Sequence, residues 1–125
     1  MLNYKLVQRP NPKDSEAAKK FYATLVSTGT LSLKDLASQI SMLSTVSRTD
    51  CVAVLTGLLE VMPMELLKGN IIQLGELGSF RTFINSDGVE DEADFRSTNI
   101  TKAKVRFFAG QELKQEMLTA TYSKL

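Results

Sequence analysis

The sequence contains no histidine and only one cysteine, Cys51, and these absences exclude most catalytic and metal-binding chemistry. A Ser-His-Asp triad, a Cys-His pair and a zinc site of His and Cys ligands cannot be assembled within one chain. A single cysteine also excludes an internal disulfide framework. A carboxylate-only enzyme stays open in principle, but the densest group of acids falls in one polar run rather than in paired positions on apolar elements. We therefore predict a protein that is not an enzyme and that has no metal site and no cofactor.

Long apolar runs are also absent from the 125 residues. No stretch approaches the roughly 18 apolar residues of a membrane-spanning helix. The first residues include Lys5, Arg9 and Pro10 where a secretory signal peptide needs an apolar core. What is present is an ordinary globular composition, with 43% hydrophobic and 23% charged residues. These features predict one compact domain in the cytoplasm, with no membrane partner and no small-molecule substrate.

The net charge of +1 conceals an uneven distribution. Residues 1–34 hold six basic and two acidic side chains, residues 35–95 hold three and ten, and residues 96–125 hold six and two. Basic ends around an acidic middle predict local rather than global attraction to an acidic partner.

Two strands and a short helix are expected in the first third of the chain. Alternation of apolar and polar residues predicts a strand over 4–7, and aromatic and β-branched residues predict another over 19–27. Apolar residues at helical spacing predict an amphipathic helix over 33–41.

A longer helix is expected after Ser47, whose hydroxyl is placed to cap it. Pro63 is expected to kink or restart this helix before it closes at Gly69. Its apolar stripe is wider than contact with one sheet requires, which indicates a second contact surface such as a partner subunit. The stripe consists of Cys51, Val52, Leu55, Leu58, Leu59 and Met62.

The second half is expected to form a sheet and a closing helix. Residues 71–84 predict a strand pair or a bent strand, and 85–94 form a polar, acidic stretch. A strand is predicted over 99–108 and a helix over 111–121. In the strand, Lys102, Lys104 and Arg106 alternate with apolar residues and share one face with Ile100. We interpret Phe80, Phe107 and Phe108 as core residues.

Five segments, taken in order, resemble the HU and integration host factor family of bacterial DNA-binding proteins. They are DLASQI at 35–40, LKGN at 67–70, IQL at 72–74, LGSFR at 77–81 and FFAGQELK at 107–114. The resemblance extends from about Leu31 to Leu118. The residues before it look like the extension found in the HU-like proteins of Bacteroides-type bacteria. We accordingly divide the chain into an N-terminal extension with two short strands (1–30), an HU-like DNA-binding domain (31–121) and a C-terminal tail (122–125).

The resemblance implies an α+β fold that forms an intertwined homodimer, with a helical base and a β-saddle that carries two arms. It also implies a histone-like, nucleoid-associated protein that binds double-stranded DNA without sequence preference. The phosphate contacts would be made by Arg81, Lys102, Lys104, Arg106 and Lys114.

The expected arm between Ile84 and Ile100 departs from the family pattern. It holds five carboxylates and one cation, Arg96, and no proline follows Pro63, so the proline with which family members bend DNA is absent. Carboxylates that face phosphate repel it. An alternative therefore stays open, in which the chain is an HU-derived interaction or assembly module that has lost strong DNA binding.

Overall fold

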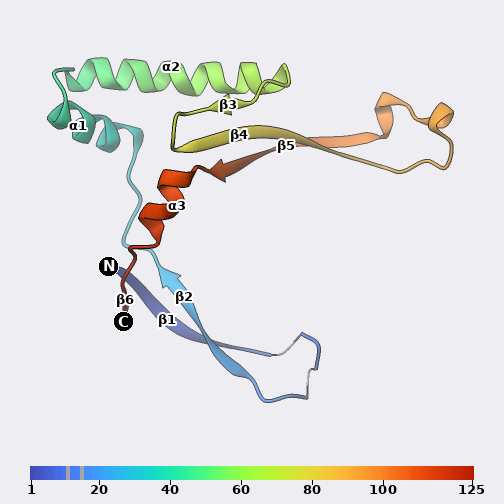
Figure 1. Cartoon of the computed structure of the whole chain (residues 1–125), viewed down its shortest axis with the longest axis horizontal. Coiled ribbons are helices and arrows are strands. Elements are labelled where there is room, and N and C mark those ends of the chain that lie inside the picture. The colour runs from blue at the N-terminus through green and yellow to red at the C-terminus, as the bar shows by residue number, and fades with distance from the viewer. Residues whose placement is uncertain (11, 15) are drawn as a thin grey trace. The chain divides into compact units, whose positions relative to one another are not determined.

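A computed structural model describes residues 1–10, 12–14 and 16–125, and within them the chain forms three α-helices and two three-stranded sheets (Figure 1). The fold is therefore a small mixed α+β fold. In chain order the strands and α-helices are β1 (Leu2–Arg9), β2 (Lys20–Val26), α1 (Leu33–Leu43), α2 (Arg48–Leu67), β3 (Ile72–Gln73), β4 (Gly78–Ser86), β5 (Ile100–Ala109), α3 (Gln111–Met117) and β6 (Tyr122–Lys124).

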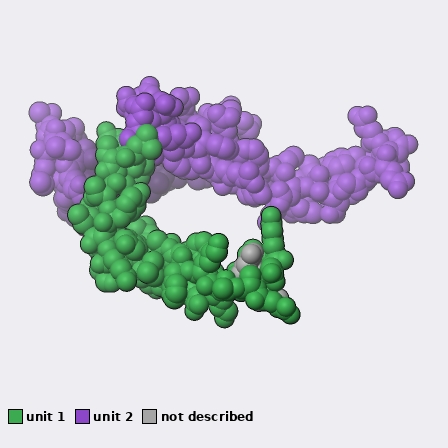
Figure 2. Space-filling view, turned by 60° about the horizontal axis from the view of Figure 1, so that its bottom comes forward, with its two compact units in different colours: residues 1–32, 116–125 green, residues 33–115 purple. Residues whose placement is uncertain are grey.

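The chain divides into two compact units, coloured separately in Figure 2. The terminal unit consists of residues 1–32 and 116–125, and the central unit consists of residues 33–115. No helix in the described part of the chain is long and apolar enough to cross a membrane.

The terminal unit is a sheet of order β2-β1-β6. β1 and β2 pair antiparallel from Asn3 opposite Val26 to Arg9 opposite Lys20, which confirms the two strands expected near the N-terminus. β6 pairs parallel to β1, and the sequence patterns had not indicated this strand. The helix predicted over 111–121 is wrong at its end, because α3 stops at Met117. The Thr121 carbonyl instead accepts a hydrogen bond of 2.8 Å from the Leu2 N–H, which draws the last residues into the sheet.

The central unit begins with the helix pair α1 and α2. The Ser47 hydroxyl caps α2 by accepting a hydrogen bond of 3.1 Å from the Asp50 N–H, as expected. The helix closes in a Schellman arrangement, in which the Asn70 N–H donates to the Glu65 carbonyl and Gly69 has φ of 88°. Only a residue without Cβ adopts this φ without strain, so the predicted closing role of Gly69 is confirmed.

Of the two outcomes predicted at Pro63, a kink or a restart, the restart is wrong, since α2 is continuous from Arg48 to Leu67. The proline removes one helical donor, and contacts beyond it hold the last turn. The Thr82 hydroxyl donates a hydrogen bond of 3.0 Å to the Leu66 carbonyl, and the Asn70 amide donates one of 2.8 Å to the Glu65 carboxylate.

The second sheet has the order β3-β4-β5, all antiparallel, and confirms the strand pair expected over 71–84. β4 and β5 form a long hairpin with an irregularity between Asn85 and Ser86. The connection between them, residues 87–99, contains the expected acidic stretch and two short 3₁₀ turns, Glu92–Asp94 and Ser97–Asn99. We call residues 87–99 the acidic arm.

The core of a single chain is thin. Among the described residues, the buried apolar side chains are Ala37, Cys51 and Leu66. Phe107 and Phe108 are 43% and 42% exposed, so their predicted place in the core is wrong for one chain by itself. A single chain therefore leaves much apolar surface exposed.

Candidate nucleic-acid interface

The register of the β4–β5 hairpin brings four of the five predicted site residues onto one face. Arg81 lies opposite Arg106, and Lys104 and Lys102 lie opposite Phe83 and Asn85. Residues directly opposite each other share a face of the sheet, and so do alternate residues along a strand. We call this surface the basic face, and it consists of Ser79, Arg81, Phe83, Asn85, Lys102, Lys104, Arg106 and Phe108.

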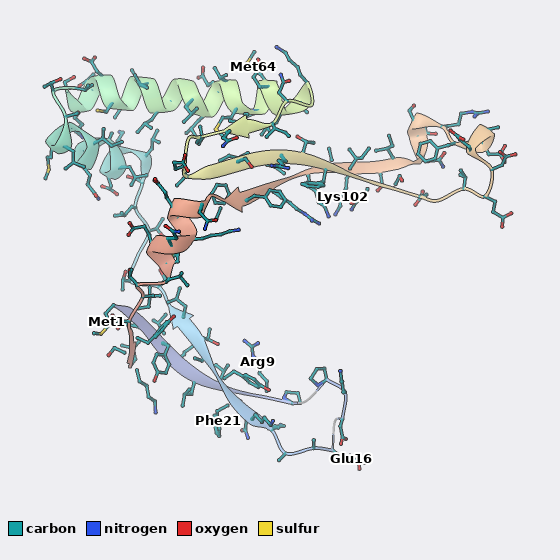
Figure 3. The ribbon with its side chains drawn as sticks, in the orientation of Figure 1. Met1, Arg9, Glu16, Phe21, Met64 and Lys102 are labelled. Carbon is teal, nitrogen blue, oxygen red and sulfur yellow. The ribbon has the colours of Figure 1, made fainter. Side chains whose placement is uncertain are left out.

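The other face of the hairpin is apolar and is turned toward α2. It carries Phe80 opposite Phe107 and Thr82 opposite Val105. The hydrogen bond from the Thr82 hydroxyl to the Leu66 carbonyl fixes this face against the helix. The basic face is therefore directed away from α2, and Figure 3 labels one of its cations, Lys102, on β5.

Two arginines of the basic face stack on its aromatic rings. The Arg81 Cζ lies 5.2 Å from the Phe108 ring centroid, and the Arg106 Cζ lies 4.9 Å from that of Phe83. The two rings pack against each other with centroids 5.9 Å apart. A stacked guanidinium keeps its charge and its planar set of N–H donors while losing side-chain freedom. The arginine charges are thus positioned in advance of any ligand.

The cations of this surface are not neutralised by acids. In the ranges that the structure describes, no ion pair involves Arg81, Lys102, Lys104, Arg106 or Lys114. The Arg81 Nε donates to the Ser79 hydroxyl at 3.3 Å, which orients the guanidinium without removing its charge. An uncompensated row of this kind attracts a polyanion.

Lys114 is not brought into the same row. It lies on α3, which begins directly after Gly110, and its backbone N–H donates to the Gly110 carbonyl at 3.0 Å. Its side chain is exposed, and no hydrogen bond or ion pair joins it to the basic face in the described residues. The predicted set is therefore four residues on one surface and a fifth on a separate element.

Sequence reasoning missed the aromatic members of the basic face, Phe83 and Phe108. A signal for Phe83 was present, because positions 81, 83 and 85 share a face of any strand. Phe108 has the parity of Arg106, which the strand over 99–108 also made visible. The apolar character of phenylalanine favoured the core interpretation, and only the pairing of β4 with β5 placed both rings beneath guanidinium groups.

The acidic arm carries its charges into solvent. Asp87, Glu90, Asp91, Glu92 and Asp94 are all exposed. The Arg96 guanidinium is held by the backbone, donating to the carbonyls of Ala93 at 2.8 Å and Phe95 at 3.2 Å. In the described residues, no group of three or more potential ligands is arranged to hold a metal ion.

Comparisons with known proteins place these features in context. A family profile described as an HU domain fused to a wHTH, Ig or glycine-rich motif (HU-HIG) matches residues 1–124. No curated protein matches the chain. Among solved structures, the chain is similar to a bacterial protein from Bacteroides vulgatus to which DNA binding has been ascribed, with 17% sequence identity and a TM-score of 0.66. The similarity covers 99% of this chain and 47% of that one, so the chain spans about half of its length.

Proposed function

The chain belongs to the HU-HIG family of HU domains fused to further motifs, and from this premise we propose that it is a structural, non-enzymatic protein that binds double-stranded DNA through its basic face. The observation that carries this proposal is the row of Arg81, Lys102, Lys104 and Arg106 on one side of the β4–β5 hairpin without an acidic partner in the described residues. Lys114 is proposed as a further phosphate contact. The proposed location is the bacterial nucleoid, in the cytoplasm.

The chemistry of the basic face favours phosphate over bases. Lysine ammonium groups act as point charges, and arginine guanidinium groups pair with phosphate oxygens in a bidentate manner. Contacts to phosphate position a protein on the duplex but carry no sequence information. Because the face offers mostly such groups, we propose binding without sequence preference, driven by counterion release. We retain residues 31–121 as the proposed HU-like domain, with 1–30 as an extension and 122–125 as a C-terminal segment.

Titration of the chain against a labelled duplex of about 30 base pairs tests the proposal directly. We expect tight binding at low salt and a log K that falls linearly with log salt. Ten cations in a dimer, five from each copy, set an upper limit of about −9 on the slope. Fluorescence anisotropy at several salt concentrations measures it. Absence of binding at low salt would contradict the proposal and favour the alternative, in which the acidic arm has left an interaction or assembly module without DNA affinity.

We further propose that the DNA-binding form is a homodimer with a helical base and a β-saddle. The chain exposes 10442 Å². Two separate compact bodies of the sizes of the terminal and central units would expose only about 7,900 Å². The excess of about 2,500 Å² per chain is larger than the roughly 800 Å² that each partner of a standard interface buries.

The exposed apolar residues of α2 point to where the second copy docks. Val54, Leu59, Val61, Met64 and Leu67 are each more than half exposed in a single chain. A helix that is apolar on most of its circumference is normally buried on most of it. Together with the exposed Phe107, these side chains supply the contact area that a helical base between two copies requires.

Sedimentation equilibrium is expected to give twice the chain mass of 13.8 kDa at micromolar concentration. The variant Leu59→Asp places a charge in the proposed interface and is expected to shift the protein toward monomer or unfolded chain, since an unpaired buried charge costs several kcal/mol. Ser97→Asp, at an exposed polar position outside α2, is the control for the added charge. A wild-type mass equal to one chain would contradict the dimer.

A further inference from the structure

The terminal sheet has one basic side. Its register sets Lys5 opposite Thr24, Val7 opposite Tyr22 and Arg9 opposite Lys20, so these side chains leave the sheet on the same face. Lys5, Arg9, Lys20 and Tyr22 are all exposed, and in the described residues none of the three cations is in an ion pair. We call this group of four residues the terminal basic face.

The opposite side of the same sheet is apolar. It carries Leu2, Leu6, Phe21, Leu25 and Tyr122, of which Phe21 is 65% and Tyr122 is 70% exposed. Figure 3 shows Arg9 and Phe21 leaving the sheet on opposite sides. A three-stranded sheet gains stability when a second layer covers its apolar side. Any such layer would cover the side of Phe21 and leave the terminal basic face in solvent.

The positive charge of the chain is concentrated in the terminal unit. Counting Lys and Arg against Asp and Glu gives six and three for residues 1–32 with 116–125, and nine and eleven for residues 33–115. The net charges are therefore +3 and −2. If only the central unit contacted DNA, the unit at the duplex would carry a net negative charge. The net positive charge of the terminal unit would then make no contact with phosphate.

The chemistry around Arg9 suits a phosphate backbone. Arg9, Pro10, Pro12 and Tyr22 line an open hollow of about 380 Å³ at the end of the paired strands. A guanidinium and a phenol hydroxyl are both donors that proteins use toward phosphate oxygens. Lys5 and Lys20 flank these two groups along the same face. The spacing of cations across two adjacent strands gives a charged strip rather than one isolated charge.

We infer that the terminal basic face is a second contact surface for duplex DNA, in which Lys5, Arg9 and Lys20 bind backbone phosphates. The inference rests on the proposed DNA binding of the chain and adds residues outside the HU-like resemblance to it. Each additional phosphate contact contributes about 0.9 to the magnitude of the salt slope. The terminal unit would then supply up to about 2.7 of the slope for each chain bound.

The test compares salt slopes of full-length variants on a labelled duplex of about 30 base pairs. In Lys5→Gln with Arg9→Gln and Lys20→Gln, the magnitude of the slope is expected to fall by about 2.7 per bound chain, and the affinity at 0.1 M salt by more than tenfold. A matched pair of single variants distinguishes the loss of a phosphate contact from a general reduction in positive charge. Lys5→Gln and Lys124→Gln each remove one cation from the same sheet, but Lys124 lies opposite Tyr4 on the apolar side.

We expect Lys5→Gln to lower the slope and Lys124→Gln to leave it unchanged. Equal slopes for wild type and the triple variant would overturn the inference, and so would equal losses in the two single variants. Circular dichroism confirms that each variant keeps its fold. The proposed function fails separately if Lys102→Glu with Lys104→Glu keeps wild-type affinity, because that result removes the basic face whatever the terminal variants do. Absence of DNA binding by the wild type would overturn both proposals.

Discussion

Reversing the charge of Lys102 and Lys104 is expected to reduce DNA affinity by about three orders of magnitude or more at 0.1 M salt. Each copy loses two phosphate contacts, so a dimer loses four, and the magnitude of the salt slope falls by about 3.6. The new carboxylates of Lys102→Glu and Lys104→Glu would also repel phosphate. Both side chains lie on the side of the hairpin turned away from α2, so the fold should be kept.

The loss should be uniform across DNA sequences. Contacts to phosphate carry no base information, so duplexes of different sequence are expected to lose affinity by the same factor. Anisotropy titrations of two unrelated duplexes measure this. The control is Lys34→Glu with Lys124→Glu, which makes the same change in net charge at two exposed lysines outside both basic faces. Selective loss on one duplex, or an equal loss in the control, would contradict phosphate binding by the basic face.

Substituting Gly110 by alanine is expected to destabilise the protein by about 3 kcal/mol, because the new methyl group has no space. A Cβ at this position would overlap the Glu76 carbonyl. The Gly110 N–H also donates to the Leu77 carbonyl at 2.8 Å. This hydrogen bond holds residue 110 against the turn at residues 76–77, so the chain cannot shift away from the Glu76 carbonyl without losing it. Backbone lies on both sides of the contact, so relief of the overlap requires the backbone to move and weakens this hydrogen bond.

Urea denaturation of Gly110→Ala measures this cost, and Gly88→Ala is the matched control. A Cβ at Gly88 meets open space in the acidic arm, so that variant should stay within about 0.5 kcal/mol of wild type. If the urea midpoint of Gly110→Ala equalled that of wild type, the turn would accommodate the methyl group with little loss of stability, and the prediction would be wrong. Gly110 lies in the FFAGQELK segment that resembles the HU family, and the close approach of the Glu76 backbone explains why this position is a glycine.

Local patterns were enough to predict most elements and the alternation of charge on β5. Residues over 20–26 form a strand because their side chains favour a pleated surface, and Ser47 begins α2 because its hydroxyl satisfies a free N–H of the first turn. The side shared by Lys102, Lys104 and Arg106 follows from the two-residue period of a strand, and it is the same in the folded protein. These features depend on neighbours within a few positions, all of which are visible in the sequence.

Contacts between residues distant in sequence decided the rest. β6 forms because the backbone groups of Leu2 and Tyr4 make hydrogen bonds with residues 121–125. The local sequence of Tyr122–Lys124 does not indicate that it pairs with β1. α2 passes through Pro63 without a break, and Thr82, sixteen residues from Leu66, bonds the turn that follows. The rings of Phe83 and Phe108 became part of the basic face when the register of β4 on β5 set them beneath Arg106 and Arg81. Alternation along one strand defines which residues share a face, whereas strand pairing determines what lies across from them and which face the helix covers.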